Sequence, residues 1–577
     1  MRRISLKGRR TAGWLALLLA MQGLASCGGG GGGGAGFIGP VTTPPTAGTT
    51  PPAPTAQESC AGIRGMTIPA SMIGKPTSGA IVQSATFVAA DAKDNTNGEY
   101  CAVTGIIVPV AAGAPTMEFQ VNLPTQWNER ALHMGGGGYD GTLVTGLGPY
   151  VSQPKGTPNA LKQGYVTLGG DGGHKGAVFD GTFALNDEAL LNYGQLSVKK
   201  VHDVAMAIIQ KRYGAKPRRF YFIGGSQGGH EGLDAAARYA ADYDGVIANY
   251  PAYNLSLLQQ ASLYVGRALY DNGGAGWIND NKRKLLVNAV YAACDSLDGL
   301  GDGIIGNIQA CNAAFNINTV KATLRCPGGA DAGDSCLSDA QINAVDKISS
   351  PYDLGFPIAG QQVFARWPLL EGGDFSFFGA GSALGFAPVP TSAATPPADA
   401  LLYTIGAAHA RYFVAKDPLL NPLTYDPANF KARLQELGGI TEVTQQSLEA
   451  FRARGGKLIL THGTTDGLIS PHNTEDYYNL QVAQFGQPAV DSFIRFFTIP
   501  GFDHGSGRYN LGYDGLAVLS NWVEKGQAPD TIASVDNNAA DPAAARSRPM
   551  CRWPLWPRFT GAAGTESNAS SYTCTAS

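Results

Sequence analysis

The sequence contains few charged residues, and the two signs nearly cancel. Asp, Glu, Lys and Arg make up 15% of 577 residues, and the formal net charge is −3. Proteins that bind nucleic acids carry clustered basic residues, so this balance predicts no nucleic-acid partner. A low charge combined with 77 glycines indicates a loop-rich exported protein.

The N-terminal apolar run is too short to cross a membrane. Residues 14–21 follow five basic residues, whereas a membrane helix needs about 20 apolar residues. Such a pattern is typical of a signal peptide. Leu24-Ala25-Ser26-Cys27 resembles a bacterial lipobox, which implies a lipoprotein signal peptide over 1–26 and lipid attachment to Cys27. Because residue 28 is Gly and not Asp, we expect an outer-membrane lipoprotein.

Residues 27–57 cannot form a core. Seven consecutive glycines follow Cys27, and Gly, Pro and Thr dominate the rest of the segment. Such composition is typical of a flexible linker. We expect ordered structure to begin near Cys60, with lipid anchoring as the chain's contact with a membrane.

The number of cysteines indicates disulfides. Removing Cys27 from the nine leaves eight, an even number in a chain expected to be exported. Eight cysteines allow roughly a hundred pairings, and free buried thiols are the alternative. Proximity along the sequence favours Cys60 with Cys101, Cys294 with Cys311, Cys326 with Cys336, and Cys551 with Cys574.

The strongest chemical signal is Gly224-Gly225-Ser226-Gln227-Gly228. It follows the aromatic and β-branched run 219–223 and precedes the helix-forming run 233–240. Strand, tight turn and helix are the context of a nucleophile elbow, where a serine projects from a sharp turn. Glycines at 224 and 228 leave room for the strand and helix backbones to cross. We expect Ser226 to be the nucleophile; the alternative is a structural glycine turn.

A run of four glycines follows the predicted strand 130–134. In hydrolases with such an elbow, a glycine loop after an early strand supplies one backbone N–H of the oxyanion hole. The residue after the nucleophile, here Gln227, supplies the second. A plain flexible loop is the alternative for the glycines.

Two later strands end in an acid and a base. Asp466 follows the predicted strand 456–460, and His504 follows the predicted strand 493–500. The order Ser, Asp, His, with each residue just past a strand, is that of α/β-hydrolases. We expect His504 to take the Ser226 proton and Asp466 to orient the imidazole. The rival bases His230 and His462 fit this order less well. The rival acid Asp503 is adjacent to His504, and an Asp rarely reaches the far nitrogen of the next His.

The β/α alternation stops between 252 and 450, a stretch with Gly- and Pro-rich loops and four cysteines. So long an insertion between hydrolase strands indicates a lid domain. We therefore predict an α/β-hydrolase core formed by 58–251 and 451–577, with a large inserted lid at 252–450.

An acidic loop lies inside the predicted lid. Asp295, Asp298 and Asp302 fall within eight residues and alternate with glycines. Carboxylate and carbonyl oxygens are the ligands that Ca²⁺ prefers, and close carboxylates repel unless a cation lies between them. The pattern predicts a structural calcium site; the alternative is a cluster of Asp/Gly turns.

The chain resembles the tannase and feruloyl esterase family, which includes mono(2-hydroxyethyl) terephthalate hydrolases. The resemblance covers about 58–577 and depends on a set of motifs: Gly135-Gly136, Asp171-Gly172-Gly173-His174, the 221–229 elbow, Tyr243-Asp244-Gly245-Val246, the 294–304 loop, Gly455-Gly456-Lys457-Leu458, His462-Gly463 with Asp466, and Ile499-Pro500-Gly501.

The resemblance implies roles for individual residues. It makes Ser226, Asp466 and His504 a catalytic triad, with Gly135 and Gln227 as oxyanion donors. It also supports the four neighbouring disulfides. The implied calcium ligands are Asp295, Asp298, Asp302 and the carbonyls of Leu300 and Ile304.

The sequence departs from the family pattern at three places. Gly225 and Gly505 stand where the family usually has two cysteines joined in a disulfide, and we expect cysteines placed there to form that bridge. The family's Arg after the elbow glycines is His230 here. Residues 367–410 contain no Arg or Lys to bind a substrate carboxylate, although Arg411 and Lys416 follow closely.

We therefore expect an exported, monomeric serine esterase that cleaves small aromatic esters, such as feruloyl or galloyl esters. Aromatic residues of the predicted lid offer surfaces for a flat ring, and core packing is their alternative role. They are Trp367, Phe375, Phe377, Phe378, Tyr403, Tyr412 and Phe413. The competing hypotheses are a terephthalate-monoester or aliphatic hydroxyacid esterase, and a non-catalytic binding protein on a hydrolase scaffold.

Overall fold

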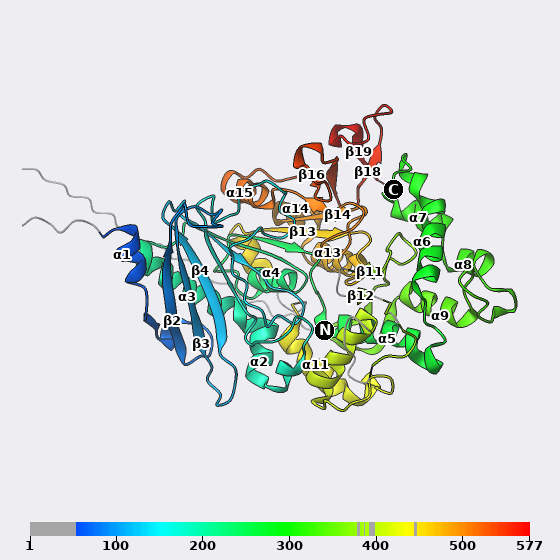
Figure 1. Ribbon diagram of the computed structural model, residues 1–577, viewed down its shortest axis with the longest axis horizontal. Coiled ribbons are helices and arrows are strands. Elements are labelled where there is room, and N and C mark those ends of the chain that lie inside the picture. The colour runs from blue at the N-terminus through cyan, green and yellow to red at the C-terminus, as the bar shows by residue number, and fades with distance from the viewer. Residues whose placement is uncertain are drawn as a thin grey trace, which may run out of the picture. The chain divides into compact units, whose positions relative to one another are not determined.

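One large mixed sheet organises the chain (Figure 1). The computed structural model describes residues 54–577 except 378–380, 383, 386, 392–398, 444–446 and 577. The sheet has 13 strands in the order β1-β2-β3-β4-β6-β5-β7-β8-β13-β14-β17-β16-β15. Their bounds are β1 (Thr67–Ile68), β2 (Gly79–Val88), β3 (Tyr100–Val108), β4 (Met117–Pro124), β5 (Arg130–Met134), β6 (Val166–Gly170), β7 (Arg219–Gly225), β8 (Gly245–Asn249), β13 (Lys457–Gly463), β14 (Ile494–Ile499), β15 (Leu511–Gly512), β16 (Thr531–Asp536) and β17 (Ser547–Arg552).

The six central strands, from β6 to β14, are parallel to one another. They are buried on both faces, so their sequences are continuous apolar runs without alternation. On β13, Leu458 and Leu460 pack against one core cluster, while Ile459 belongs to another on the opposite face. This is the α/β-hydrolase architecture that the sequence predicted.

Helices cover both faces of the parallel strands. Residues of α3 (Ser197–Tyr213), α4 (Gln227–Ala237) and α13 (Pro471–Phe485) belong to the same apolar cluster as Leu458. Residues of α15 (Gly515–Lys525) belong to the cluster that contains Ile459. The carboxyl ends of β7, β13 and β14 are left to carry the loops with Ser226, Asp466 and His504.

The segment between β8 and β13 forms a mainly helical insertion, since these two strands are neighbours in the sheet. Its helices are α5 (Leu255–Gly274), α6 (Asp280–Cys294), α7 (Ile308–Ala314), α8 (Ile317–Thr323), α9 (Asp339–Ile348), α10 (Leu401–Ala408), α11 (Lys431–Thr441) and α12 (Glu449–Ala453), with a small sheet of β9 (Tyr352–Ile358) and β10 (Gln361–Phe364). It contributes most of a third apolar cluster. The domain boundaries at 251/252 and 450/451 stay a prediction.

All four disulfides between neighbouring cysteines are present. The S–S distances are 1.96 Å for Cys60–Cys101, 2.04 Å for Cys294–Cys311, 2.00 Å for Cys326–Cys336 and 1.98 Å for Cys551–Cys574. Four disulfides indicate a protein that folds outside the reducing cytoplasm.

The N-terminal predictions fall mostly outside the described residues. The signal peptide over 1–26 and the lipidation site Cys27 lie there entirely. Within the described residues, α1 (Ala56–Ala61) overlaps the predicted end of the linker and starts with a capping box between Thr55 and Glu58. No helix of the described part is long and apolar enough to span a membrane.

Candidate active site

Ser226 occupies a sharp turn between β7 and α4. Its φ of 61° and ψ of −122° are strained for a residue with a side chain. A Cβ on Gly224 would lie 2.2 Å from the Gly228 carbonyl oxygen, so the strand and helix cross at a distance that only glycine allows. Hydrogen bonds from the Ser226 N–H to Asn249 O (3.1 Å) and from the Ala252 N–H to Ser226 O (3.0 Å) fix the turn.

Asp466 and His504 meet at the ends of β13 and β14. The His504 Nδ1 and the Asp466 Oδ2 are 2.8 Å apart. Asp466 is fully buried, and its Oδ1 accepts hydrogen bonds from the N–H groups of Leu468 and Ile469, both at 2.9 Å. Burial raises the pKa of Asp466, but the two neighbouring imidazoles outweigh it and hold that pKa well below its usual value. An ionised Asp466 on Nδ1 leaves Nε2 of His504 to act on a serine.

The rival acid and base have other partners. Asp503 accepts hydrogen bonds from the N–H groups of Gly467 (2.9 Å) and His504 (2.7 Å), and burial together with the Asp466 charge raises its pKa well above the usual value. His462 lies 3.3 Å from Asp466 Oδ2, and its Nδ1 is 2.8 Å from Thr474 Oγ1. His462 is thus a second imidazole beside Asp466, a contact that the sequence analysis missed although the i, i+4 spacing of the two residues was visible.

A cavity of about 420 Å³ connects the candidate nucleophile and base. Ser226 and His504 both line it, and His504 is the one ionisable acid or base of the Asp, Glu, Lys, Arg and His types among its described lining residues. The remaining lining is largely apolar: Gly136, Gly137, Gly138, Tyr139, Val151, Val178, Phe179, Gly225, Gln227, Tyr250, Ala252, Leu255, Leu258, Gln259, Ser262, Ile405, Leu468 and Ile469. The cavity can hold a drug-sized, uncharged group next to Ser226.

Tyr250 packs between the serine turn and the histidine loop. Its ring centroid is 4.6 Å from that of His504 and 5.9 Å from that of Phe502. A Cβ on Gly225 would lie 2.8–2.9 Å from the Tyr250 ring and hydroxyl. Tyr250 occupies the space that a side chain at position 225 would need, so the predicted bridge between cysteines at 225 and 505 would require this ring to move.

Two buried carboxylates anchor the glycine loop. The Gly136 N–H donates to Glu231 Oε2 at 2.9 Å, and the Gly137 N–H donates to Asp140 Oδ2 at 2.9 Å. Burial raises the pKa of Asp140 well above its usual value and that of Glu231 to about 7. These contacts hold the loop against α4.

The structure does not bring the Gly135 N–H to the cavity. That group donates to the Ile223 carbonyl at 3.0 Å, which continues the pairing of β5 with β7, and Gly135 is not a lining residue. The oxyanion assignment to Gly135 is therefore wrong for this structure. Of the glycines that line the cavity, Gly136 and Gly137 already donate their N–H groups to Glu231 and Asp140, which leaves Gly138 as the candidate. Gln227 lines the cavity and begins α4, and its role as the second oxyanion donor stays a prediction.

The predicted calcium ligands share one loop but are not gathered around a point. Asp295 accepts hydrogen bonds from the Gly303 and Ile304 N–H groups, and Asp298 from the Leu300 and Gly306 N–H groups. Asp302 pairs with Arg548, while its Oδ1 is buried without a hydrogen-bond partner. The loop thus offers the predicted oxygen donors, one of them unsatisfied, and an ion would have to compete with Arg548 for Asp302.

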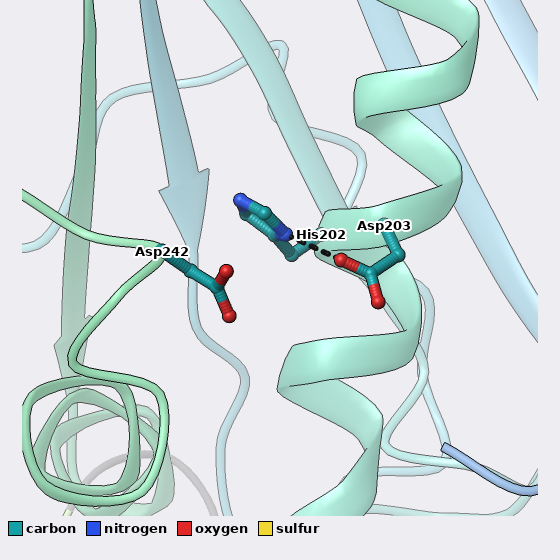
Figure 2. A group of neighbouring side chains, drawn as sticks. All are labelled: His202, Asp203 and Asp242. Carbon is teal, nitrogen blue, oxygen red and sulfur yellow. Dashed lines mark hydrogen bonds and ion pairs between the residues drawn. The ribbon is translucent and has the colours of Figure 1, made fainter. Parts of the chain in front are cut away.

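Another group of potential ligands is already neutralised. Within the described residues, His202, Asp203 and Asp242 form the one group of three whose ligand atoms all lie within 4.8 Å of one another (Figure 2). The Lys199 ammonium lies between the carboxylates, 2.7 Å from Asp203 Oδ1 and 2.9 Å from Asp242 Oδ2. The Gly74 N–H also donates to Asp203. This cluster is an ion-pair network that holds α3, because Lys199 supplies the positive charge that a metal would bring.

The chain is similar to known proteins over most of its length. The family model described as tannase and feruloyl esterase matches residues 101–575. The chain belongs to the tannase and feruloyl esterase family. It is 38% identical to an uncharacterized esterase of Agrobacterium fabrum, over 89% of this chain and 92% of that one. It is 32% identical to the mono(2-hydroxyethyl) terephthalate hydrolase of Piscinibacter sakaiensis, over 82% and 84%.

The chain also resembles a solved structure and a third sequence relative. Feruloyl esterase B from Aspergillus oryzae superposes with a TM-score of 0.71 and 20% identity, over 90% of this chain and all of that one. A probable feruloyl esterase of Arthroderma benhamiae is 29% identical, over 85% and 89%. Family and fold together show that the protein is a carboxylic ester hydrolase.

Most of the aromatic lid residues that we expected to contact a substrate are instead buried in the apolar interior of the insertion. Trp367, Phe375, Tyr403 and Phe413 are at most 2% exposed, and none of them lines the cavity. Tyr412 does not line the cavity either, and the side chains of Phe377 and Phe378 lie outside the described residues. The aromatic residues that line the cavity are Tyr139, Phe179 and Tyr250. They lie on loops of the predicted hydrolase domain, and none of them was expected from the sequence to contact a substrate.

Proposed function

We propose that the esterase hydrolyses uncharged aromatic-acid esters through a Ser226–His504–Asp466 triad. Ser226 attacks the ester carbonyl while His504 Nε2 accepts its proton, and His504 then returns that proton to the leaving alcohol. Water, activated by the same imidazole, hydrolyses the acyl-enzyme. The N–H groups of Gln227 and Gly138, both cavity-lining residues, would stabilise the oxyanion, since those of Gly136 and Gly137 already donate to buried carboxyl groups. The Asp466–His504 hydrogen bond on the cavity of Ser226 is the observation that carries this proposal.

The lining of the cavity favours an uncharged acyl group. The two candidate anchors for a carboxylate are occupied elsewhere: Arg411 Nε donates to Leu420 O at 2.9 Å, and Lys416 pairs with Asp187 at 2.9 Å. Neither lines the cavity, and no internal residue outside the described part is Lys or Arg. A buried carboxylate without a cation is costly, so a terephthalate monoester is the second candidate, supported by the 32% identical relative.

A panel of esters tests the proposal. The purified protein should hydrolyse methyl ferulate, methyl gallate and p-nitrophenyl butyrate, and should be slower on a terephthalate monoester than on its neutral methyl ester. Ser226→Ala is the control that identifies the nucleophile. Activity that persists in Ser226→Ala would rule out the triad. Complete inactivity on the panel would favour the binding-protein hypothesis.

We also propose a structural calcium ion in the 294–311 loop and a monomeric, lipid-anchored enzyme. Asp295, Asp298, Asp302 and the Leu300 and Ile304 carbonyls would hold the ion, and the Cys294–Cys311 disulfide closes the loop that contains them. When bound, the ion would neutralise the carboxylates and stiffen the loop.

The outer-membrane anchor is a separate prediction. Bacteria that express the full chain and are fed a labelled fatty acid should incorporate the label, and Cys27→Ser should abolish this incorporation while the released protein stays active. Equal labelling of both forms, or none of the native form, would contradict lipidation of Cys27.

A further inference from the structure

One face of helix α5 forms part of the wall of the cavity next to Ser226. Leu255, Leu258, Gln259 and Ser262 all line the cavity, and this i, i+3, i+4, i+7 spacing is one face of a helix. The helix begins close to Ser226, because the Ala252 N–H donates to the Ser226 carbonyl at 3.0 Å. The cavity wall therefore extends along α5 from the nucleophile.

This face changes from apolar to polar along the helix. Leu255 and Leu258 come first, and Gln259 and Ser262 follow, although both polar residues are at most 5% exposed. Gln259 Oε1 is buried without a hydrogen-bond partner. A buried acceptor without a partner destabilises the folded protein, so such an atom in a binding cavity calls for an explanation.

The position of the two polar residues matches the length of an aromatic acyl group. At 1.5 Å per residue, Gln259 and Ser262 lie about 6 and 10 Å further along the helix axis than Leu255. These lengths are comparable to the span from an ester carbonyl across one ring, or across a ring with a two-carbon link, to a para substituent. Other side chains that line the cavity, such as Ile405 and Leu468, are apolar.

We propose that Gln259 and Ser262 are specificity-determining residues that bind an uncharged hydroxyl group at the far end of the acyl group. A phenol O–H would donate to Gln259 Oε1, and the Ser262 hydroxyl would donate to the phenol oxygen. A substrate with a hydrogen atom in place of the phenol hydroxyl would leave Gln259 Oε1 unpaired. A substrate with a carboxylate there would place a negative charge next to this acceptor, with no cation in the cavity lining to neutralise it. This assignment rests on the proposed function, because it places the substrate's carbonyl at Ser226.

The test compares matched esters and matched variants. The kcat/KM of the wild type should be about 10-fold to 100-fold higher on methyl 4-hydroxybenzoate than on methyl benzoate, or on methyl 4-hydroxycinnamate than on methyl cinnamate. Gln259→Leu and Ser262→Ala should each lower this ratio at least several-fold, with a larger loss of kcat/KM on the hydroxylated ester than on the unsubstituted one.

Gln260→Leu is the matched control. Gln260 neighbours Gln259 on the same helix and is equally buried, but it pairs with His409 at 3.2 Å and does not line the cavity. It should keep the wild-type ratio. Thermal unfolding of each variant separates a folding defect from a change of specificity, and Ser262→Ala is the mild change that remains informative if Gln259→Leu unfolds.

The outcomes separate this inference from the function on which it rests. A wild-type ratio near one in both ester pairs, or a ratio that neither variant changes, overturns the roles of Gln259 and Ser262. Hydrolysis that depends on Ser226 in the same experiment leaves the esterase mechanism intact. Absence of Ser226-dependent hydrolysis on every ester would instead overturn the proposed function.

Discussion

Replacing Asp466 with Asn should lower kcat about 10⁴-fold, as expected when a triad acid loses its charge. The carboxylate accepts from His504 Nδ1 at 2.8 Å and carries its charge in the folded protein, since its pKa is held well below the usual value. An amide can turn its NH₂ group towards Nδ1 and favour the wrong tautomer of the imidazole. KM should change little, because Asp466 is fully buried and does not line the cavity.

Asp503→Asn is the matched control for this prediction. Asp503 is buried beside the same histidine, and its Oδ1 accepts hydrogen bonds from two N–H groups, which an amide oxygen also accepts. Burial and the Asp466 charge raise the pKa of Asp503, which favours the neutral form that an isosteric amide resembles. We expect kcat within about 3-fold of the wild type. If Asp503→Asn were the inactive variant and Asp466→Asn the active one, the assignment of the acid would be wrong.

Removing calcium should destabilise the folded protein, with a smaller effect on the chemical step. A ligand at 100 times its Kd stabilises the folded state by about 2.7 kcal/mol, and chelation would remove that contribution. The reason lies in the 294–311 loop, which holds three Asp residues, and in which Asp302 Oδ1 is buried without a hydrogen-bond partner. Thermal unfolding in the presence of EGTA should show a lower Tm, and added Ca²⁺ should restore it.

Two Asp variants make the calcium prediction specific. Asp302→Asn removes one charge from the loop and should weaken the response of Tm to Ca²⁺. Asp334→Asn changes an exposed Asp of the same insertion that bonds Asn279 and Asn281, and it should respond like the wild type. The same Tm with EGTA and with Ca²⁺ would mean that Arg548, which already pairs with Asp302, takes the place of the ion.

Local patterns along the sequence were sufficient for the features that depend on neighbouring residues. The elbow around Ser226 follows from strand, glycine turn and helix, because only glycine fits at 224 where the two backbones cross. The disulfide pairs follow from proximity along the chain, since their separations range from 10 to 41 residues. The order Ser226, Asp466, His504 follows from parallel strands whose carboxyl ends share one edge.

Only the tertiary structure showed which of several possible partners a polar group binds, and whether an aromatic side chain lies at the cavity or in the interior. Gly135 was a reasonable oxyanion donor by position, but the pairing of β5 with β7 uses its N–H. Trp367 and Phe375 were reasonable ring platforms by composition, but they are buried in the insertion's core. No local pattern shows which of two possible partners a group contacts, since the partner comes from a distant segment.

The sequence by itself determined the fold class, the disulfides and the identities of the nucleophile, acid and base candidates, because each is encoded within short segments and their order. Only the tertiary structure decided that Tyr250 fills the space beside Gly225, that His462 joins His504 at Asp466, and that the cavity is uncharged with Gln259 and Ser262 on one wall. The physical reason is that shape and electrostatic environment arise from side chains hundreds of residues apart, whose mutual distances exist only once the sheet and its insertion have packed.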